Sequence, residues 1–389
     1  MHRKDDVTDQ IASDRTAQVV LITGAFGQVG KRCAEILLRR GRTVIAMDLQ
    51  NDKTTVVADE LGAQSHGGTL VVAYADLLDA DTISECVSRH QPAAIVHLAA
   101  MLAPASYRNP LLARKINVEG THNLVAAARA LPDPPLFVDA SSASVYGSRN
   151  RYTHPHRITA ETPVNPIDQY GEDKVLAEEV VRTSGLPHAV LRLGGVISTD
   201  VKSNFSADYL VLMRATPRDN QLHTVDARDV ALAFANAVDR RDAVNGKTLL
   251  IGGDDTHLHA FRDVEDDMMQ AVGVGRLGPS ASLPGDPDDE RGWGFTGFFD
   301  TTEAQDLLSF QEHSWDQTLA WVADSLGRLR LVLKVSGPAI RPVMRTLLAV
   351  QRKAERRGRF ANPWALIEKN YGPGALATGV ARSEAADPR

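Results

Sequence analysis

The sequence predicts an α/β fold in which a doubly wound parallel sheet carries helices on both faces. The main observation is that short apolar runs alternate with stretches of helical spacing through the first half of the 389-residue chain. The runs are "VVLIT", "TVIAMD", "TLVVAYADLLD", "AAIVHLAA", "PLFVDASSASVYG" and "HAVLRLGGV". Strands joined by helical crossovers pair in parallel, and such sheets bind ligands beyond the carboxyl ends of the strands. The first candidates for function are therefore the residues that end or follow the runs: Gly24, Asp48, Asp76, Ala99, Ser142 and Gly194.

The second observation is a glycine-rich turn between the first strand and the first helix, residues 31–40. Gly24, Gly27 and Gly30 stand in this turn, where glycine lets the backbone turn tightly, approach a pyrophosphate and pack the helix against its strand. The next strand ends in Asp48, at a distance along the chain that suits a carboxylate binding the adenosine ribose of NAD. The turn and the acid together predict a dinucleotide-binding (Rossmann) domain.

A third observation is the stretch "DQYGEDKVLAEE", which places Tyr170 four residues before Lys174. On a helix the two side chains share one face. A phenol with a pKa of about 10 is a poor base near neutrality, and a nearby ammonium favours its ionised form. The pair is common on ordinary helix faces, so it gains meaning only beside the glycine turn and the acid.

Composition and charge indicate an ordinary globular protein. The chain is 43% hydrophobic and 24% charged, with a net charge of −6. Its two cysteines cannot build a disulfide framework, which fits a reducing compartment. The charged N-terminal stretch lacks the apolar core of a signal peptide, and no uncharged apolar run reaches the ~18 residues that span a bilayer. We expect a cytoplasmic protein.

Seven motifs occur together in one order. They are the glycine turn, "DL" at 76–77, "HLAA" at 97–100, "NVEGT" at 117–121, "SSASVYG" at 141–147, "YGEDK" at 170–174 and "DARDVA" at 226–231. In this order the chain resembles the extended short-chain dehydrogenases/reductases, and specifically the NAD-dependent epimerase/dehydratase family. The resemblance covers roughly residues 18 to 325.

The resemblance implies roles for individual residues. Tyr170 would be the catalytic acid or base, and Lys174 would tune it and bind the nicotinamide ribose. Ser142, four residues before the "YG", would orient the substrate oxygen, with Ser144 as its rival on the same side of an extended segment. The implied cofactor-binding residues are Gly24, Phe26, Gly27, Gln28, Val29, Asp48, Asp76, Leu77, Ala99, Ala100, Asn117, Tyr170 and Lys174. Asn117 either helps to order the site or merely fixes a helix beside the sheet.

The expected cofactor is NAD. A carboxylate at Asp48 repels the 2′-phosphate of NADP, and the following "LQND" offers no arginine to compensate. His97 follows a strand, but a single histidine in an apolar run is more often an interior residue, so it receives no role. No His, Cys and acid cluster has metal-ligand spacing, and we expect no metal.

The family carries out epimerisation, dehydration and alcohol oxidation. Its sugar dehydratases carry an acidic pair directly after the catalytic hydroxyl residue, where this chain has Ala143 and Ser144, so dehydration is disfavoured. Three alternatives remain: an NAD-dependent oxidoreductase acting on a secondary alcohol or ketone, which we favour, an NDP-sugar epimerase, and a non-catalytic NAD-binding regulatory protein. We expect a homodimer and no nucleic-acid partner.

The substrate region is short, with about 30 residues between Gly195 and the "DARDVA" motif, which favours a smaller or more apolar substrate than a nucleotide sugar. Arg214 and Arg218 are either solvated surface residues, the interpretation we favour, or phosphate contacts. The Gly-, Pro- and Asp-rich segment 276–297 is predicted to be an irregular loop over the site, and residues 300–322 resemble the family's closing helix pair.

The resemblance ends before a basic segment. Residues 328–359 contain ten Lys or Arg and one acid, a net charge of +9 in a chain of −6. Pro342 suits a first helical turn and Gly358 a stop, which predicts a helix of about four turns. The apolar side of the predicted helix carries Ile340, Val343, Met344, Leu347, Leu348 and Val350, and the other side carries Arg341, Arg345, Arg352, Lys353, Arg356 and Arg357. The apolar side would either pack on the enzyme or a second subunit, the alternative we favour, or lie on an anionic membrane; nucleic acid is the remaining alternative.

The chain is therefore predicted to have four regions. They are a disordered tail at 1–17, an NAD-binding Rossmann domain at 18–193, a small substrate-binding region at 194–325 interleaved with it, and a basic amphipathic helical extension at 326–389.

Overall fold

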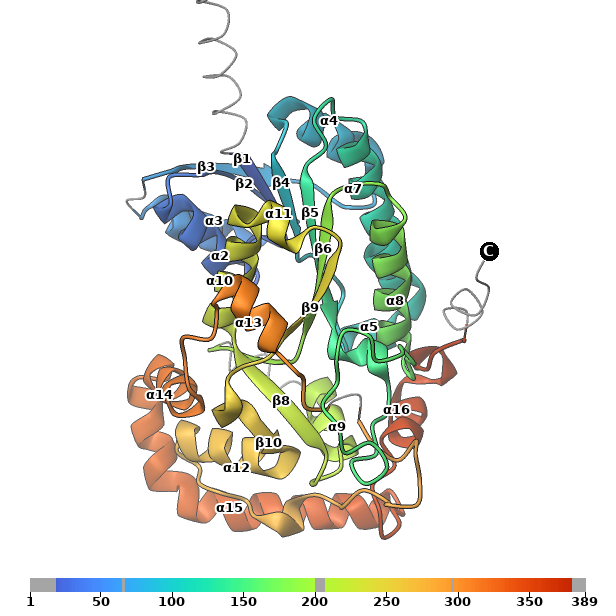
Figure 1. Ribbon diagram of the computed structural model, residues 1–389. Helices are drawn as coiled ribbons and strands as arrows, with labels where there is room; N and C mark the ends of the chain where they lie inside the picture. The colour runs from blue at the N-terminus through green and yellow to red at the C-terminus, as the bar shows by residue number, and fades with distance from the viewer. Residues whose placement is uncertain (1–18, 65–66, 200–206, 295–296, 380–389) are drawn as a thin grey trace, which may run out of the picture.

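A seven-stranded parallel sheet forms the centre of the molecule in the computed structural model, which describes residues 19–64, 67–199, 207–294 and 297–379 (Figure 1). The strand order is β3-β2-β1-β4-β5-β6-β9, so the order reverses between β1 and β4. The predicted fold class is confirmed. The strands are β1 (Val19–Thr23), β2 (Thr43–Asp48), β3 (Thr69–Tyr74), β4 (Ala94–His97), β5 (Leu136–Ser142), β6 (His188–Leu193) and β9 (Lys247–Ile251).

Helices cover both faces of this sheet because its central strands are apolar on both sides. One face packs against α2 (Gly30–Arg39), α3 (Asp52–Gly62) and α10 (Ala227–Asp239). The other packs against α4 (Ala80–His90), α7 (Gly120–Arg129) and α8 (Gln169–Arg182). Short helical segments α5 (Ala105–Arg108), α6 (Pro110–Arg114), the π-helical η1 (Lys115–Glu119), the 3₁₀ turn η2 (Ala143–Tyr146) and α11 (Arg241–Val244) lie in the connections.

A smaller layer lies beyond the carboxyl ends of the strands. It contains a three-stranded sheet ordered β10-β8-β7. The strands are β7 (Gly195–Ile197), β8 (Gln221–Asp226) and β10 (Leu258–Ala260), and the helices beside them are α9 (Ala207–Ala215) and α12 (Phe261–Val272), with 3₁₀ turns η4 (Asp255–His257) and η5 (Pro279–Ala281). Because β9 returns to the large sheet between these elements, the two layers are interleaved in sequence.

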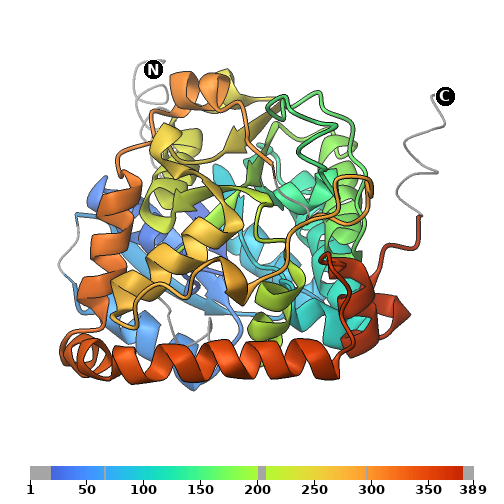
Figure 2. The same ribbon diagram turned by 90° about the horizontal axis from the view of Figure 1, so that it is seen from below.

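Four helices end the described chain: α13 (Thr302–Leu308), α14 (Trp315–Ser325), α15 (Arg328–Ala354) and α16 (Pro363–Tyr371), followed by the 3₁₀ turn η6 (Pro373–Ala375). In Figure 2, α15 runs as one long rod along the edge of the molecule, with α16 turning back at its end. Among the described residues, no helix is both long and apolar enough to cross a membrane.

The predicted start of the basic helix is wrong. The helix begins at Arg328, not near Pro342, and it ends at Ala354, before Gly358. Pro338 and Pro342 both stand inside it, although proline removes a backbone hydrogen bond and usually ends a helix. Packing offsets this cost, because one side of the helix is held against the segment after α12 by Leu333, Ile340, Met344 and Leu348.

Candidate active site

A cavity of about 670 Å³ lies at the carboxyl ends of β1, β2, β4 and β5, where the strand order reverses. This is the place at which doubly wound sheets bind their ligands. Most of the residues expected to bind the cofactor meet there. Those that line the cavity are Gly24, Gly27, Gln28, Val29, Asp48, Asp76, Leu77, Ala99, Ala100, Tyr170 and Lys174.

The glycine turn is required by close backbone contacts. Gly24 has a φ of +65°, and a Cβ atom there would lie 2.9 Å from the backbone nitrogen of Ala99. A Cβ atom at Gly30 would lie 2.2 Å from the carbonyl oxygen of Gly24, so a side chain at either position would push the turn open. The backbone of the turn is therefore free to approach a phosphate at the N-terminus of α2.

Asp48 is held in place by two backbone donors. The N–H of Phe26 donates to Oδ2 at 3.0 Å, and the N–H of Leu49 donates to Oδ1 at 2.8 Å. The Phe26 side chain is buried and does not line the cavity, so this residue acts on the site through its backbone. The carboxylate stays at the cavity wall, where a ribose would need it.

Asn117 is buried and does not line the cavity either. Its Oδ1 accepts from the N–H of Met101 at 2.8 Å, and its Nδ2 donates to the carbonyl of Met101 at 3.2 Å. Nδ2 also lies 3.4 Å from Asp173 Oδ2 on α8. Asn117 thus joins the segment after β4 to the helix of Tyr170 and Lys174, which favours an ordering role.

Ser142 and Tyr170 come together at the mouth of the cavity. The two hydroxyls hydrogen-bond, and this bond lowers the pKa of the phenol. Burial has the larger effect and raises the pKa of Tyr170 above its ordinary value, with Asp168, Asp139 and Asp173 adding to the rise. The phenol of Tyr170 is therefore protonated at neutral pH, and its pKa is shifted upward, whereas the charge of Lys174 was expected to lower it.

Lys174 donates from Nζ to the carbonyl of Ala140 at 2.6 Å, which aims its ammonium along the floor of the cavity. Burial lowers the pKa of Lys174, and Asp139 is the first of the carboxylates that oppose this. Ser144, the rival of Ser142, is fully buried and lines neither this cavity nor the next one. The geometry favours Ser142 as the serine that a substrate meets.

Asp139 was missed by the sequence reasoning. It stands in the middle of β5 and is fully buried near Lys174, and neither of its carboxylate oxygens has a hydrogen-bond partner among the residues that the structure describes. Burial raises its pKa to about 6, although Lys174 lowers it. The available signal was a single acid inside the apolar run "PLFVDASS".

His97 is an interior residue, as expected. One ring nitrogen lies 2.7 Å from the hydroxyl of Thr23 and the other 3.0 Å from that of Thr121. Burial, together with the charge of Lys174, lowers its pKa to about 3, so the imidazole is neutral. It connects β1, β4 and α7 beneath the cavity.

A buried ion pair lies behind α8, the helix that carries Tyr170 and Lys174. Arg192 on β6 donates from Nε to Glu178 Oε1 at 2.9 Å and from Nη2 to Oε2 at 2.7 Å. Both side chains are 3% exposed. Arg192 also donates to the hydroxyl of Tyr146, so α8, β6 and the turn after β5 form one rigid support.

A second cavity, of about 340 Å³, adjoins the first. The two share Val196 and Ser198 in their walls, and Ser142 lies in the wall of the second. Its lining is mostly apolar and includes Leu212, Met213, Leu222, Phe261, Val264, Met268, Met269 and Val272. Among the described residues that line it, Glu265 alone is ionisable, and burial raises the pKa of Glu265 to about 7.

The two arginines considered as phosphate contacts lie elsewhere. Arg214 forms an ion pair with Glu355 at 3.1 Å, and Arg218 donates to the carbonyl of Pro279 at 3.2 Å. Neither lines the second cavity. Contrary to the prediction, neither arginine is simply solvated on the surface, because each is bonded to a residue in the C-terminal half of the chain.

The C-terminal extension covers the start of α8. Trp364 and Ile367 of α16 belong to one buried cluster with Tyr107, Ile167 and Tyr170. Glu172, two residues after Tyr170, accepts hydrogen bonds from the N–H and hydroxyl of Thr378 and from the N–H of Gly379. No local pattern in the sequence predicts this contact, which joins segments about 200 residues apart.

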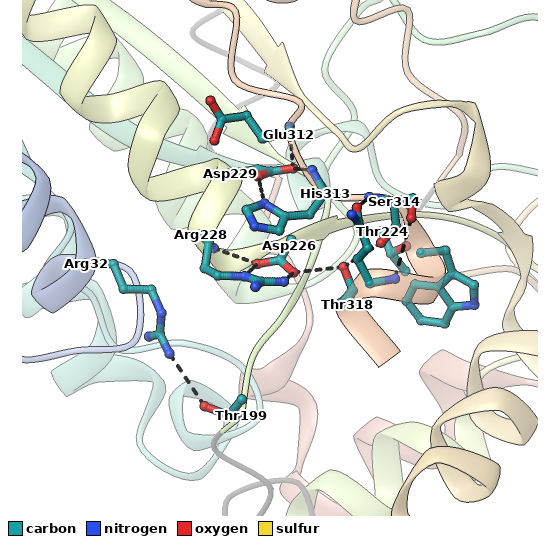
Figure 3. Close-up of polar contacts among 12 residues, drawn as sticks. Arg32, Thr199, Thr224, Asp226, Arg228, Asp229, Glu312, His313, Ser314 and Thr318 are labelled. Atoms are coloured by element: carbon teal, nitrogen blue, oxygen red, sulfur yellow. Dashed lines mark hydrogen bonds and ion pairs between the residues drawn. The ribbon is translucent and has the colours of Figure 1, made fainter. Parts of the chain in front are cut away.

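The "DARDVA" motif is a structural junction (Figure 3). Asp226 accepts from Arg228 and from the hydroxyl of Thr318 on α14 at 2.8 Å. Asp229 pairs with Nδ1 of His313 at 2.5 Å and accepts from the N–H groups of Glu312 and His313. The motif therefore fixes the start of α10 to the segment that leads into α14.

Comparison with known proteins agrees with this geometry. Residues 21–193 match the family described as GDP-mannose 4,6 dehydratase. A short-chain dehydrogenase/reductase superfamily protein from Agrobacterium tumefaciens, solved with bound NAD, superposes with a TM-score of 0.60 and 25% identity over 81% of this chain and 98% of that one. Over the matched residues, the chain is similar to the extended short-chain dehydrogenases/reductases. The resemblance recognised from the sequence motifs is confirmed.

Other proteins similar to this chain are named as sugar epimerases. The UDP-glucose 4-epimerase of Mycolicibacterium smegmatis is 31% identical over 41% of this chain and 48% of its own length. That of Lactobacillus helveticus is 25% identical over 62% and 72%. The UDP-Glc/GlcNAc 4-epimerase from Campylobacter jejuni shares the fold, with a TM-score of 0.65 at 20% identity over 81% of this chain and 99% of that one.

The curated matches are partial. Over the first five relatives, the aligned part is between 40% and 72% of the relative's length. Several solved neighbours contain NAD, so the predicted cofactor is confirmed for the family. The family match includes the glycine turn and Ser142, and it ends at β6, before most of the residues that line the second cavity.

Proposed function

We propose that the protein is an NAD-dependent oxidoreductase that transfers a hydride between the nicotinamide and the carbinol carbon of an apolar secondary alcohol or ketone. The observation that carries the proposal is the position of Ser142 and Tyr170, whose hydroxyls meet where the larger cavity joins the apolar one. An alcohol seated in the apolar cavity has its oxygen at these two hydroxyls.

The residues of the larger cavity fit NAD. Asp48 would hold the adenosine ribose and Lys174 the nicotinamide ribose, while the backbone of the glycine turn faces the pyrophosphate. NAD supplies the hydride acceptor or donor. Ser142 orients the substrate oxygen, and Tyr170 takes the hydroxyl proton during oxidation or returns it during reduction. The raised pKa of Tyr170 suits the donor direction, which is ketone reduction.

The lining of the second cavity supports an uncharged substrate. A nucleoside diphosphate needs cationic or N–H donors for its phosphates, because burying an uncompensated charge is costly. The described residues that line this cavity include no Lys or Arg. These points favour an apolar alcohol or ketone over a nucleotide sugar.

A second candidate is an epimerase that oxidises a sugar and returns the hydride to the other face. The UDP-glucose 4-epimerase relatives favour it. The two candidates differ in their products, because an oxidoreductase accumulates NADH or NAD and an epimerase shows no net change. The third candidate, a regulatory protein, would bind NAD and turn over neither class of substrate.

The test is a panel of apolar secondary alcohols and ketones and of UDP-sugars, followed at the NADH absorbance and by chromatography of the sugars. We expect net NADH change with an apolar compound and none with UDP-sugars. In Tyr170→Phe, turnover should fall at least about a hundredfold while NADH affinity is nearly unchanged. Epimerised sugar with constant NADH absorbance would favour the second candidate, and wild-type turnover in the variant would refute the role of Tyr170.

A further inference from the structure

The outer side of α15 carries a stripe of exposed apolar side chains. Seven of them are more than half exposed, and Val335 is 85% exposed. The seven are Leu329, Leu331, Val332, Val335, Val343, Leu347 and Val350. At 100° per residue, all but Leu331 fall within an arc of about 120°. The stripe runs along a helix of 27 residues, which is about 40 Å long.

The stripe faces outward because the opposite side of the helix is fixed to the enzyme. Three arginines donate to backbone carbonyls of the last turn of α12 and of the segment that follows it. Arg330 reaches Ala271 at 2.9 Å, Arg345 reaches Leu277 at 2.6 Å, and Arg352 reaches Ser280 at 2.7 Å. These bonds and the packing of Ile340, Met344 and Leu348 prevent the helix from rotating its apolar side inward.

The orientation of α15 differs from the one predicted from the sequence. Val343, Leu347 and Val350 were predicted to share a buried side with Ile340, Met344 and Leu348, but they are exposed. Several of the arginines predicted to face outward bind the protein instead. A helix arranged only to cover the enzyme would not need an apolar outer side of this length.

The charge around the stripe identifies the surface that it fits. Residues 328–359 carry a net charge of +9, so the rest of the chain carries about −15. Arg328 and Lys353 are exposed at one edge of the stripe, and Arg356 and Arg359 are exposed just beyond its end. A second copy of the chain docked here across a two-fold axis would bring two such basic helices together and repel. An anionic lipid surface attracts the same charge.

We propose that α15 is a membrane-docking helix that lies in the interface of an anionic bilayer, with the apolar stripe in the lipid and the flanking basic side chains at the phosphate headgroups. An apolar face with basic residues beside it is the combination that interfacial helices use. The inner side of α15 stays on the enzyme, so docking requires no unfolding.

The position of α12 links this surface to the site. Met268, Met269 and Val272 of α12 pack in the same hydrophobic cluster as the inner side of α15, and all three also line the apolar cavity. Docking would therefore hold that cavity one helix away from the lipid. This link rests on the proposed function, but the membrane contact itself does not.

The experiment measures sedimentation of the full-length protein with vesicles of phosphatidylcholine, with and without 30% phosphatidylglycerol. The test variant is Val335→Glu/Leu347→Glu, which places two acids in the stripe. The matched control is Val56→Glu/Leu111→Glu, which makes the same exchanges at exposed positions of α3 and α6. Circular dichroism of each variant checks that the fold is retained, and turnover is measured separately.

We expect the wild type and the control to bind the anionic vesicles, with binding weakened in 0.5 M salt and on neutral vesicles. The test variant should bind at least about tenfold more weakly. Absence of wild-type binding, or equal binding by the test and control variants, would overturn the proposal. The proposal would also be overturned if light scattering showed the wild type and the control to be dimers and the test variant a monomer. The stripe would then be an interface between two copies of the chain. Since vesicle binding needs neither substrate nor Tyr170, its failure is distinct from failure of the proposed function.

Discussion

Replacing Gly171 by alanine should separate the two hydroxyls of the site. Gly171 follows Tyr170 in the first turn of α8, and a Cβ atom there would lie 2.5 Å from the carbonyl oxygen of Ser144 and 2.8 Å from Asp168 Oδ1. An ordinary contact needs at least 3.4 Å, so the helix must move away from the turn after Ser142 by about 0.9 Å. A displacement of about 1 Å can cost about a hundredfold in rate.

The assay is kcat for hydride transfer at saturating NAD, with NADH affinity and thermal unfolding measured on the same protein. We expect kcat to fall about a hundredfold, NADH affinity to change little, and unfolding to be destabilised by about 1–3 kcal/mol. Gly62→Ala is the matched control, because the nearest atom to its Cβ would be 3.9 Å away, on Leu70. A folded Gly171→Ala protein with kcat within threefold of wild type would refute the geometric reasoning.

Three further predictions concern the support of the site. Asp48→Ser should weaken NAD binding and reduce the ratio of NAD affinity to NADP affinity, both measured by calorimetry. If the wild type bound NADP more tightly than NAD, the role of Asp48 would be contradicted. Asp139 has a pKa near 6 in the fold against 3.8 when unfolded, so it binds its proton more tightly in the native state and costs stability as pH rises through that window. Asp139→Asn should therefore raise the free energy of unfolding more at pH 8 than at pH 4.5, by up to about 3 kcal/mol in urea unfolding, and an equal gain at both pH values would be inconsistent. Glu178→Ala leaves Arg192 buried without its partner and should cost about 3–5 kcal/mol in urea unfolding, whereas a loss below 1 kcal/mol would show that solvent reaches the arginine.

The sheet and the cofactor cavity were predictable because their signals are local. Each strand is a short apolar run, and the glycine turn, Asp48 and the pair Tyr170 and Lys174 sit at spacings that a strand, a turn or one helical turn fixes. Their meeting at one edge follows from parallel pairing alone. The catalytic roles assigned to Ser142, Tyr170 and Lys174 stay predictions.

The extension was less predictable because distant contacts decide it. Pro342 indicated a helix start, but tertiary packing and arginine bonds extend the helix back to Arg328. The same bonds determine which side of the helix faces outward. Helical periodicity in the sequence does not specify that side. Likewise, nothing near Tyr170 in sequence shows that α16 covers it. The homodimer and the cytoplasmic location also stay predictions, since the first depends on a second copy of the chain and the second on the cell.

The bonds from Thr378 and Gly379 to Glu172 have a consequence for synthesis. Glu172 leaves the ribosome more than 200 residues before its partners, so the Rossmann strands can pair while α8 still lacks part of its cover. Contacts of such high sequence separation form late and slowly. During translation, the nascent chain can acquire a dinucleotide cavity well before the surroundings of Tyr170 are complete, so cofactor binding should precede the finished catalytic centre on the growing chain.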